Sequence, residues 1–243
     1  MQAGWAVDTW LWEDSRLTYI FLSSMLAAAG VAVIWIALAE EVGSIPAGAI
    51  NLVITVTGVA GYLFLASPDL RAAGLEAYAV GCAVLAVFNA VLVVRTWGLA
   101  PRDRRPTPAP VRASYVLFTV ILLAVGLALI LGVDDIMPWP LLPETSVVIG
   151  WIFFGDGFYF LYAVLRPEWG RAKAQLWSFL AYDVVLIPPL VAHYLDGVPD
   201  DLVTNVIVYL VVLVYSGALA VCYLFFGMRE DRASARLREE VRH

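Results

Sequence analysis

Apolar residues form seven long runs along the chain, separated by short polar stretches. A helix rises about 1.5 Å per residue, so roughly 20 residues are needed to cross the hydrocarbon core of a bilayer. Runs of that length occur at 17–39, 47–67, 77–94, 114–133, 146–165, 174–195 and 203–226. The pattern therefore predicts an all-α protein, a polytopic membrane bundle of seven transmembrane helices.

The composition agrees with this pattern and excludes a soluble domain. Of the 243 residues, 62% are hydrophobic and 15% are charged, and the mean hydropathy is +0.82. A soluble domain of this size cannot bury so much apolar surface. We expect one transmembrane domain over 17–227, an outer interfacial segment at 1–16 and a charged cytoplasmic tail at 228–243.

The basic residues predict the orientation of the bundle. Thirteen of the fifteen Lys and Arg side chains fall on one side of the predicted helices, and only Arg16 and Arg71 fall on the other. Cytoplasmic loops carry such an excess, so we expect a multi-pass protein of the cell membrane with its N-terminus outside and its C-terminus in the cytoplasm. Fourteen of the fifteen basic residues are Arg, a usage typical of a high-GC or salt-adapted prokaryote.

The longest predicted connection, at 98–113, is rich in proline and arginine. Pro101, Pro106, Pro108 and Pro110 should keep it extended and non-helical. It is either a spacer retained inside by its arginines or a docking strip for a cytoplasmic partner or anionic lipid headgroups.

Two acidic residues lie deep inside predicted helices and are the main functional candidates. Asp156 precedes Arg166 by ten residues and Asp183 follows Lys173 by ten residues, so both should lie at the same depth. Ionisable groups at this depth are costly and indicate function. The two helices should be antiparallel neighbours, and two carboxyls held close together could share or pass a proton.

Residues near these acids suggest how such a site could work. Gly155 would allow close approach of a neighbouring helix, and Tyr159 and Tyr182 lie beside the acids. Pro188 and Pro189 free backbone carbonyls that could serve as cation ligands near Asp183. Further polar positions that could extend a path are Asn51, Thr55, Thr57, Asn89, Asn205, Tyr209 and Ser216. The alternative is that each acid stays protonated and bonds an ordinary neighbour.

Histidine and cysteine content limits the chemistry. The chain has only His193 and His243, so a bis-His haem or a His-rich zinc site is not expected. Cys82 and Cys222 should lie at different depths and remain unbridged. No hydrolase, redox or phosphate-binding motif is present, so a non-enzymatic role is preferred, and an enzyme is left open.

The layout of seven helices with an external N-terminus resembles that of microbial rhodopsins. The last helix, VVLVYSGALAVCYLFFGMR from Val211, has a similar small and aliphatic texture around Ser216, Gly217 and Ala218. That family carries its retinal-binding lysine in this helix, where the present sequence has Ala218. The only lysine is Lys173 at the cytoplasmic edge, so covalently bound retinal is not expected.

These observations leave three readings. The preferred one is a small transporter or channel for protons or cations, using Asp156, Asp183, Tyr159 and Tyr182. The second is a sensory or hydrophobic-ligand-binding protein, or a non-catalytic subunit of a membrane complex, with Trp151, Phe154, Phe158 and His193 as ligand-binding candidates. The third, a membrane-embedded enzyme, would depend on the same two acids. The expected partners are the lipid bilayer and a cation, proton or apolar small molecule, with a homo-oligomer or complex left open and no nucleic acid.

Overall fold

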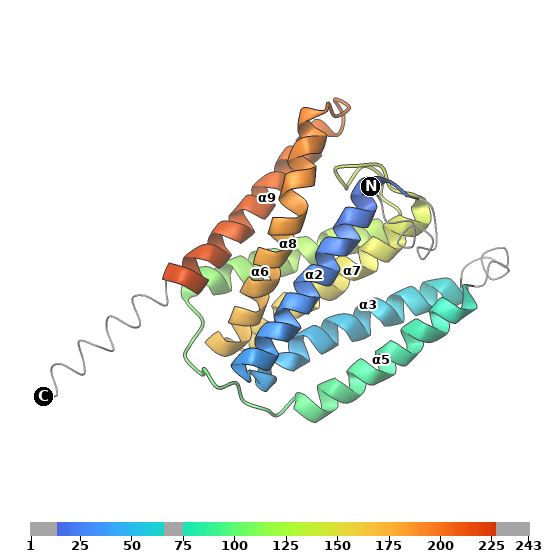
Figure 1. Cartoon of the computed structure of the whole chain (residues 1–243). Helices are drawn as coiled ribbons and strands as arrows, with labels where there is room; N and C mark the ends of the chain where they lie inside the picture. Colours follow the sequence, from blue (N-terminus) through green and yellow to red (C-terminus); the bar gives the residue numbers. More distant parts are fainter. Residues whose placement is uncertain (1–13, 66–74, 227–243) are drawn as a thin grey trace, which may run out of the picture.

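The computed structural model describes residues 14–65 and 75–226 and confirms a bundle of seven helices long and apolar enough to cross a membrane. Figure 1 shows their arrangement. The elements are α2 (Arg16–Ala39), the short η1 (Val42–Ser44), α3 (Ile45–Leu65), α5 (Glu76–Thr96), α6 (Ala109–Ile130), α7 (Pro143–Leu165), α8 (Trp169–Leu195), α9 (Val203–Val221) and the π-helical η2 (Cys222–Phe226). Most of the predicted outer segment 1–16 and all of the predicted tail 228–243 lie outside the described residues.

Two helices, α6 and α8, begin five residues earlier than the apolar runs predict. α6 begins at Ala109 with Pro110 in its first turn, where proline is tolerated because the first amide protons have no partner within the helix. The prediction that Pro110 lies in a non-helical segment was therefore wrong. α8 begins at Trp169 rather than at residue 174. The apolar run does not include the first turn of this helix, because that turn is polar.

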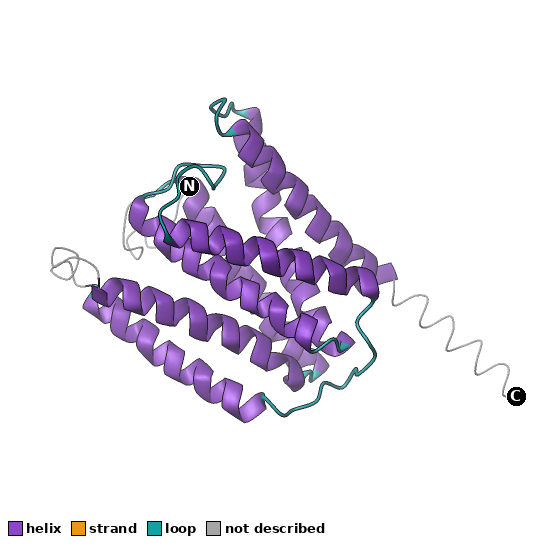
Figure 2. Ribbon diagram, turned by 180° about the vertical axis from the view of Figure 1, so that it is seen from behind, coloured by secondary structure: helices purple, strands orange, loops and turns teal. Residues whose placement is uncertain are grey.

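The seven helices form two layers. In one layer α5 packs against α3, α3 against α7 and α7 against α6, and in the other α8 packs between α2 and α9. Figure 2 shows the four-helix layer in front, and Figure 1 shows α2, α8 and α9 on the opposite side. α7 and α8 thus meet mainly through side chains that cross from one layer to the other.

Glycine allows the backbones of α6 and α7 to approach closely within the four-helix layer. A Cβ on Gly126 of α6 would lie 2.6 Å from the backbone nitrogen of Phe154, and one on Gly150 of α7 would lie 2.8 Å from the carbonyl oxygen of Gly126. Both distances are below van der Waals contact. Small residues at helix interfaces are a usual means of close packing in membranes.

Aromatic side chains fill the space between the layers. Phe160 of α7 stacks on Phe179 of α8 with ring centroids 4.9 Å apart, and Phe118 of α6 lies 4.8 Å from Phe179. Nearer the other end of the bundle, Phe21 of α2 meets Phe153 of α7 edge to face at 5.4 Å. These large rings hold the layers apart while keeping the interface packed.

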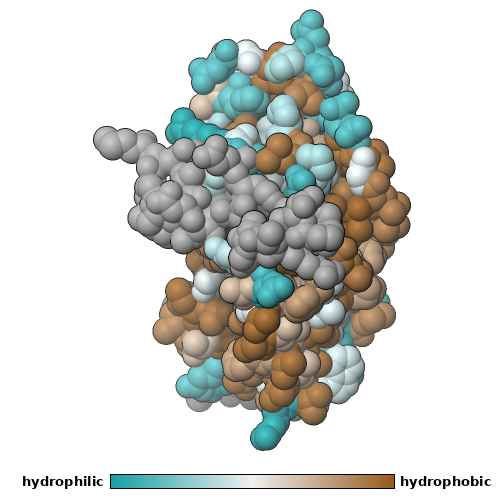
Figure 3. All heavy atoms as spheres, turned by 90° about the vertical axis from the view of Figure 1, so that its right-hand side faces the viewer, coloured by the Kyte–Doolittle hydropathy of each residue, from teal (hydrophilic) through white to brown (hydrophobic). Residues whose placement is uncertain are grey.

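The outer surface of the bundle is apolar, as expected for helices in contact with lipid. Exposed side chains on α5 include Val84, Val87, Phe88, Val91 and Val94. Figure 3 shows apolar residues over much of the flank, with polar residues gathered towards the upper end and lower rim. This surface fits contact with a lipid bilayer.

The helix ends fall into two groups, named here by their charge. The basic end comprises residues 40–44, 97–108 and 166–173, which include most of the described arginines and Lys173. The acidic end comprises residues 131–142 and 196–202, with five aspartates: Asp134, Asp135, Asp196, Asp200 and Asp201. The chain passes from one end to the other along each helix.

Candidate functional site

Asp156 lies in the middle of α7 and is bonded to α3. The Asn51 side-chain amide donates to Asp156 Oδ1 at 2.6 Å. Thr55 Oγ1 lies 3.0 Å from Asn51 Oδ1 and 3.2 Å from the carbonyl oxygen of Trp151. The Thr55 hydroxyl donates to Asn51 Oδ1, and the Asn51 NH₂ group is directed towards Asp156.

Gly155 makes this contact between α3 and α7 sterically feasible. A Cβ at Gly155 would lie 2.2 Å from Thr55 Oγ1 and 2.4 Å from Asn51 Oδ1. The expectation that Gly155 lets a neighbouring helix approach closely agrees with this geometry. The neighbour is α3.

Asp183 lies in α8 and is bonded to α9. It is 2% exposed, and Ser216 Oγ lies 3.1 Å from each of its carboxyl oxygens. A Cβ at Gly217 would lie 3.1 Å from Asp183 Oδ2, so the small residue leaves room for the carboxyl group. Ser216 Oγ also lies within hydrogen-bonding distance of the Val212 and Leu213 carbonyls.

The two carboxyls therefore bond different helices rather than each other. In the described part of the chain, the hydrogen bonds of Asp156 go to α3 and those of Asp183 go to α9. Between α8 and α9, the hydroxyl oxygens of Tyr182 and Tyr209 are 2.5 Å apart. Among the described residues, neither tyrosine hydroxyl is hydrogen bonded to Asp156 or Asp183.

A second hydroxyl pair lies between α7 and α8. Tyr159 Oη is 3.3 Å from Ser178 Oγ, and Tyr159 follows Asp156 by three residues on α7. The Gln175 amide donates to the Tyr159 carbonyl oxygen at 2.6 Å. Sequence reasoning missed Ser178 and Gln175, because Gln175 lies at the predicted beginning of its helix and Ser178 alone resembles an ordinary small residue.

The prolines of α8 do not interrupt the helix. Pro188 and Pro189 lie inside a continuous helix that extends to Leu195, while the Asp183 carboxyl bonds Ser216 on α9. Among the described residues, no group of three or more His, Cys, Asp or Glu side chains could hold a metal ion. Cation coordination by the carbonyls near Asp183 stays a prediction.

The aromatic ligand-binding candidates form a ladder along α7. Ring centroids are 5.8 Å apart between Trp151 and Phe154 and 5.5 Å apart between Phe154 and Phe158. Trp151 also packs on Gly58, where a Cβ would lie 2.0 Å from its ring. His193 lies apart from this ladder in the last turn of α8, and its buried Nε2 has no hydrogen-bond partner among the described residues.

Trp151 lines an apolar groove of about 720 Å³ between α3, α6 and α7. Its other lining residues are mainly aliphatic or glycine, with Thr57 and Tyr62 as the polar ones: Val53, Ile54, Thr57, Gly58, Gly61, Tyr62, Leu65, Ile130 and Val147. Phe154, Phe158 and His193 do not line it. Of the four ligand-binding candidates, the structure therefore places Trp151 in this groove.

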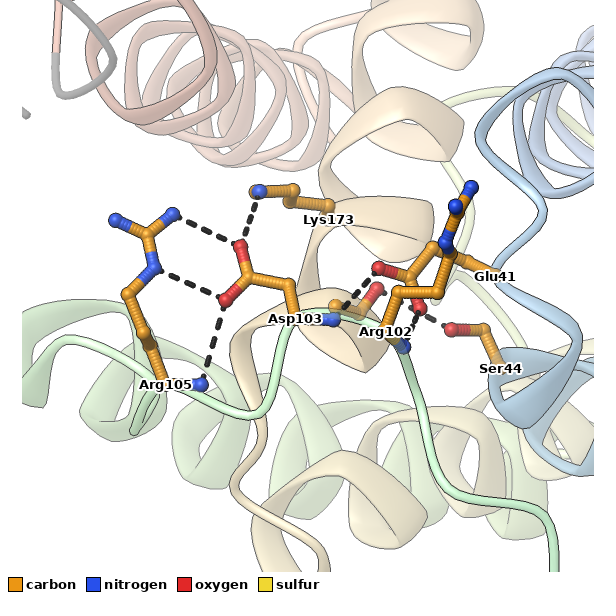
Figure 4. A network of polar contacts seen from close by, with 7 residues as sticks. Glu41, Ser44, Arg102, Asp103, Arg105 and Lys173 are labelled. Carbon is orange, nitrogen blue, oxygen red and sulfur yellow. Dashed lines mark hydrogen bonds and ion pairs between the residues drawn. The ribbon is translucent and has the colours of Figure 1, made fainter. Parts of the chain in front are cut away.

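The basic end carries the densest polar network, shown in Figure 4. The carboxylate of Glu41, which is 4% exposed, accepts the backbone amides of Arg102 at 2.7 Å and Asp103 at 3.0 Å. The Asp103 carboxylate in turn accepts from Lys173 Nζ at 2.7 Å and from Arg105 at 2.8 and 2.9 Å. The hydrogen bonds from Arg105, together with those from Lys173, lower the pKa of Asp103 well below its ordinary value.

Arg171 joins several helix connections at this end. It is 3% exposed, and its guanidinium donates to the Gly43 carbonyl, the Leu99 carbonyl at 3.0 Å and the Tyr162 hydroxyl at 2.7 Å. It also pairs with Glu168. One buried cation therefore ties the beginning of α8 to the α2–α3 and α5–α6 connections and to the end of α7.

The proline-rich connection is anchored by its backbone. The Thr107 amide donates to the Pro167 carbonyl at 2.8 Å, and the Trp169 amide donates to the Arg105 carbonyl at 2.7 Å. These bonds flank an isolated bridge between Pro106 and Glu168, so the segment is extended there as predicted. The connection contributes to the packing of the basic end in addition to separating two helices, a role that neither sequence reading included.

A comparison of the chain with protein-family models, with curated proteins and with solved structures finds no match. Lys173, its only lysine, lies at the basic end with its ammonium group bonded to Asp103.

Proposed function

We propose that this integral membrane protein moves protons across the bilayer through the space between its two helix layers. Asp156 and Asp183 would take up and release the protons, and the tyrosine hydroxyls would connect them. The observation that carries the proposal is the absence of a cationic partner for either acid. Among the described residues, Asp156 accepts from an amide and Asp183 from a hydroxyl, and neither forms an ion pair.

An uncompensated carboxylate in the middle of a membrane protein is costly, so its charge must be neutralised by a proton or a cation. The two basic side chains on α8 are already engaged at the basic end. Arg171 pairs with Glu168 and Lys173 pairs with Asp103. The proton is the neutralising species that fits without rearranging these pairs.

The donors around the carboxyls favour a proton over a metal cation. Cations are held by oxygen atoms that direct lone pairs towards them, whereas Asn51 directs an N–H group at Asp156. Ser216 donates to Asp183 in the same way. Either contact places positive partial charge where a cation would bind, but leaves a carboxyl oxygen able to carry a proton.

The hydroxyl groups supply the connections that proton transfer requires. A hydroxyl can donate one hydrogen bond while accepting another, so a proton can arrive at one side and leave from the other. Tyr159 with Ser178, and Tyr182 with Tyr209, are such pairs within the spans. The Tyr182–Tyr209 pair joins α8, in which Tyr182 precedes Asp183 in the chain, to α9.

The proposal can be tested in liposomes that contain the purified protein and a pH-sensitive dye. A potassium gradient with valinomycin sets the membrane potential, and the initial rate of internal pH change is measured. We expect Asp156→Asn and Asp183→Asn each to lower the rate at least tenfold. Asp200→Asn, at an exposed position of the acidic end, is the matched control and should leave the rate unchanged.

Two results would overturn proton movement as the function. One is a wild-type rate equal to that of empty liposomes, and the other is a wild-type rate that neither intramembrane substitution lowers. Helix content and gel-filtration behaviour of each variant must match the wild type. A lower rate of proton movement then reflects a change in the proton path and not misfolding.

The groove beside Trp151 supports a second candidate function, binding of an apolar small molecule. Its volume of about 720 Å³ lies within the range of small-molecule sites. Mass spectrometry of extracts from purified protein should then detect one enriched apolar compound. Gly58→Leu, which places a side chain where the Trp151 ring lies, should abolish the enrichment, while Gly81→Leu on α5, where an added Cβ meets no atom within 4 Å, should not. Equal extracts from all three proteins would exclude this function.

A further inference from the structure

Gln175 of α8 has a fully buried side-chain amide whose nitrogen is hydrogen bonded and whose oxygen has no partner among the described residues. It is 0% exposed, and its Nε2 donates to the Tyr159 carbonyl oxygen of α7 at 2.6 Å. Its Oε1 accepts no hydrogen bond from any described residue. Buried amide oxygens are otherwise nearly always paired with a protein donor or an internal water.

The orientation of this amide is fixed by its partner. A backbone carbonyl can only accept, so the NH₂ group of Gln175 must face Tyr159. Turning the amide over would bring two oxygens together and lose the bond. Oε1 is therefore directed away from the Tyr159 carbonyl oxygen and needs a donor from outside the described residues.

We infer that Gln175 Oε1 binds an internal water molecule, and that this water extends the proposed proton path from Tyr159 and Ser178 towards the basic end. The second part of this inference rests on the proposed function. Water is the ligand that fits, because it can donate to the amide oxygen and still accept a proton from a neighbouring hydroxyl. An apolar ligand would leave the oxygen unpaired.

The position of Gln175 along the helices supports this role. Ser178 lies one turn from Gln175 on α8 and contacts the Tyr159 hydroxyl at 3.3 Å. In the other direction, Arg171 lies one turn from Gln175 and belongs to the network at the basic end. Gln175 thus lies between the hydroxyl pair near Asp156 and the polar groups of that end.

The water site can be tested separately from proton movement by radiolytic hydroxyl labelling. An X-ray pulse converts bound water to hydroxyl radicals, which modify adjacent side chains, and mass spectrometry reads the modified residue. We expect labelling of the buried Tyr159 in the wild type and at least a fivefold decrease in Gln175→Leu. Gln175→Met, which keeps the unbranched shape, serves as the second variant if Gln175→Leu does not fold.

The matched control is Thr119→Val, which removes a buried polar group bonded within its own helix to the Tyr115 carbonyl at 2.8 Å. It should leave Tyr159 labelling unchanged. The same proteins are then measured for proton flux in liposomes, where both Gln175 variants should lower the rate at least tenfold.

The two readouts separate failure of this inference from failure of the proposed function. Absent Tyr159 labelling in the wild type, or labelling that both Gln175 variants retain, would overturn the water site whatever the flux. Labelling that depends on Gln175 in a protein without proton flux would support the water site and overturn its role in a proton path.

Discussion

The Asn51 amide donates to Asp156 Oδ1 at 2.6 Å and so joins the second turn of α3 to the middle of α7. The bond places a neutral donor against a carboxyl group within a membrane span. The Thr55 hydroxyl donates to the other end of the amide, at Asn51 Oδ1. The acid and its partner therefore act as one unit, in which loss of either member leaves the other without its hydrogen bond.

Replacing Asn51 with Leu should destabilise the protein by about 1–3 kcal/mol, because the Asp156 carboxyl loses its only side-chain donor among the described residues. The double variant Asn51→Leu with Asp156→Leu should recover part of this loss, since both partners are then apolar. The free energy of unfolding can be measured by SDS titration of mixed micelles.

The matched control for this substitution is Asn89→Leu. Asn89 is also a buried amide within a span, but it donates to the Leu85 carbonyl of its own helix at 2.9 Å. Asn89→Leu should therefore lower the free energy of unfolding by less than Asn51→Leu does. Suppose that both substitutions lower the free energy of unfolding equally and that the double variant regains none of it. The contact between Asn51 and Asp156 would then not contribute to stability.

Gly155→Ala should also destabilise the bundle, by about 1–3 kcal/mol, because its Cβ would overlap Thr55 Oγ1 and Asn51 Oδ1. Gly48→Ala on α3 is the control, because a Cβ there meets no atom within 4 Å. That change should be neutral or stabilise the helix by up to about 1 kcal/mol. The same SDS titration compares the two variants, and a neutral Gly155→Ala would contradict the close approach of α3 to α7.

The sequence was sufficient to predict the seven helices because a bilayer imposes long apolar runs, which are visible without knowledge of packing. It was less informative at helix ends. The apolar run begins after Arg171 and Lys173, whereas α8 begins before them, at Trp169. The helix can include both cations because their charges are paired with Glu168 and Asp103. Hydropathy describes the transfer of single side chains from water into an apolar phase, so it takes no account of ion-pair partners.

The candidate acids could be found from their depth, but their partners could not. Successive residues turn by about 100° around a helix, so spacing alone does not say which neighbour a carboxyl faces. Asn51 and Ser216 were among the polar candidates, and their pairing with Asp156 and Asp183 emerged from the packing of α3 and α9. The order of helices in the two layers decides these contacts.

Stability at the basic end should fall in acid. The pKa of Asp103 is lowered in the folded protein, chiefly by Arg105 and also by Lys173. The ion pairs therefore contribute fully above the ordinary pKa of about 3.8, and the contribution is lost as the pH falls from there towards the lower folded value. In that range the unfolded chain binds a proton that the folded protein does not.

Asp103→Asn tests this dependence. At pH 7 it should cost up to about 1 kcal/mol, because the pairs are partly exposed. The difference in unfolding free energy between Asp103→Asn and the wild type should shrink below pH 4. Glu40→Gln, which removes the more exposed ion pair with Arg102, is the control and should cost less at pH 7. A difference for Asp103→Asn that stays constant down to pH 3 would contradict the lowered pKa.

The basic end is expected to face the cytoplasm, because thirteen of the fifteen Lys and Arg side chains lie on that side of the predicted spans. Cysteine labelling tests this in a background in which Cys82 and Cys222 are replaced by Ala. Single cysteines are then introduced at Arg104 of the basic end and at Asp200 of the acidic end, both exposed positions. In intact spheroplasts, a membrane-impermeant maleimide should label Asp200→Cys within minutes and Arg104→Cys only after the membrane is opened. The reverse pattern would mean that the bundle is inverted, and labelling of both positions in intact spheroplasts would mean that it is not inserted in one orientation.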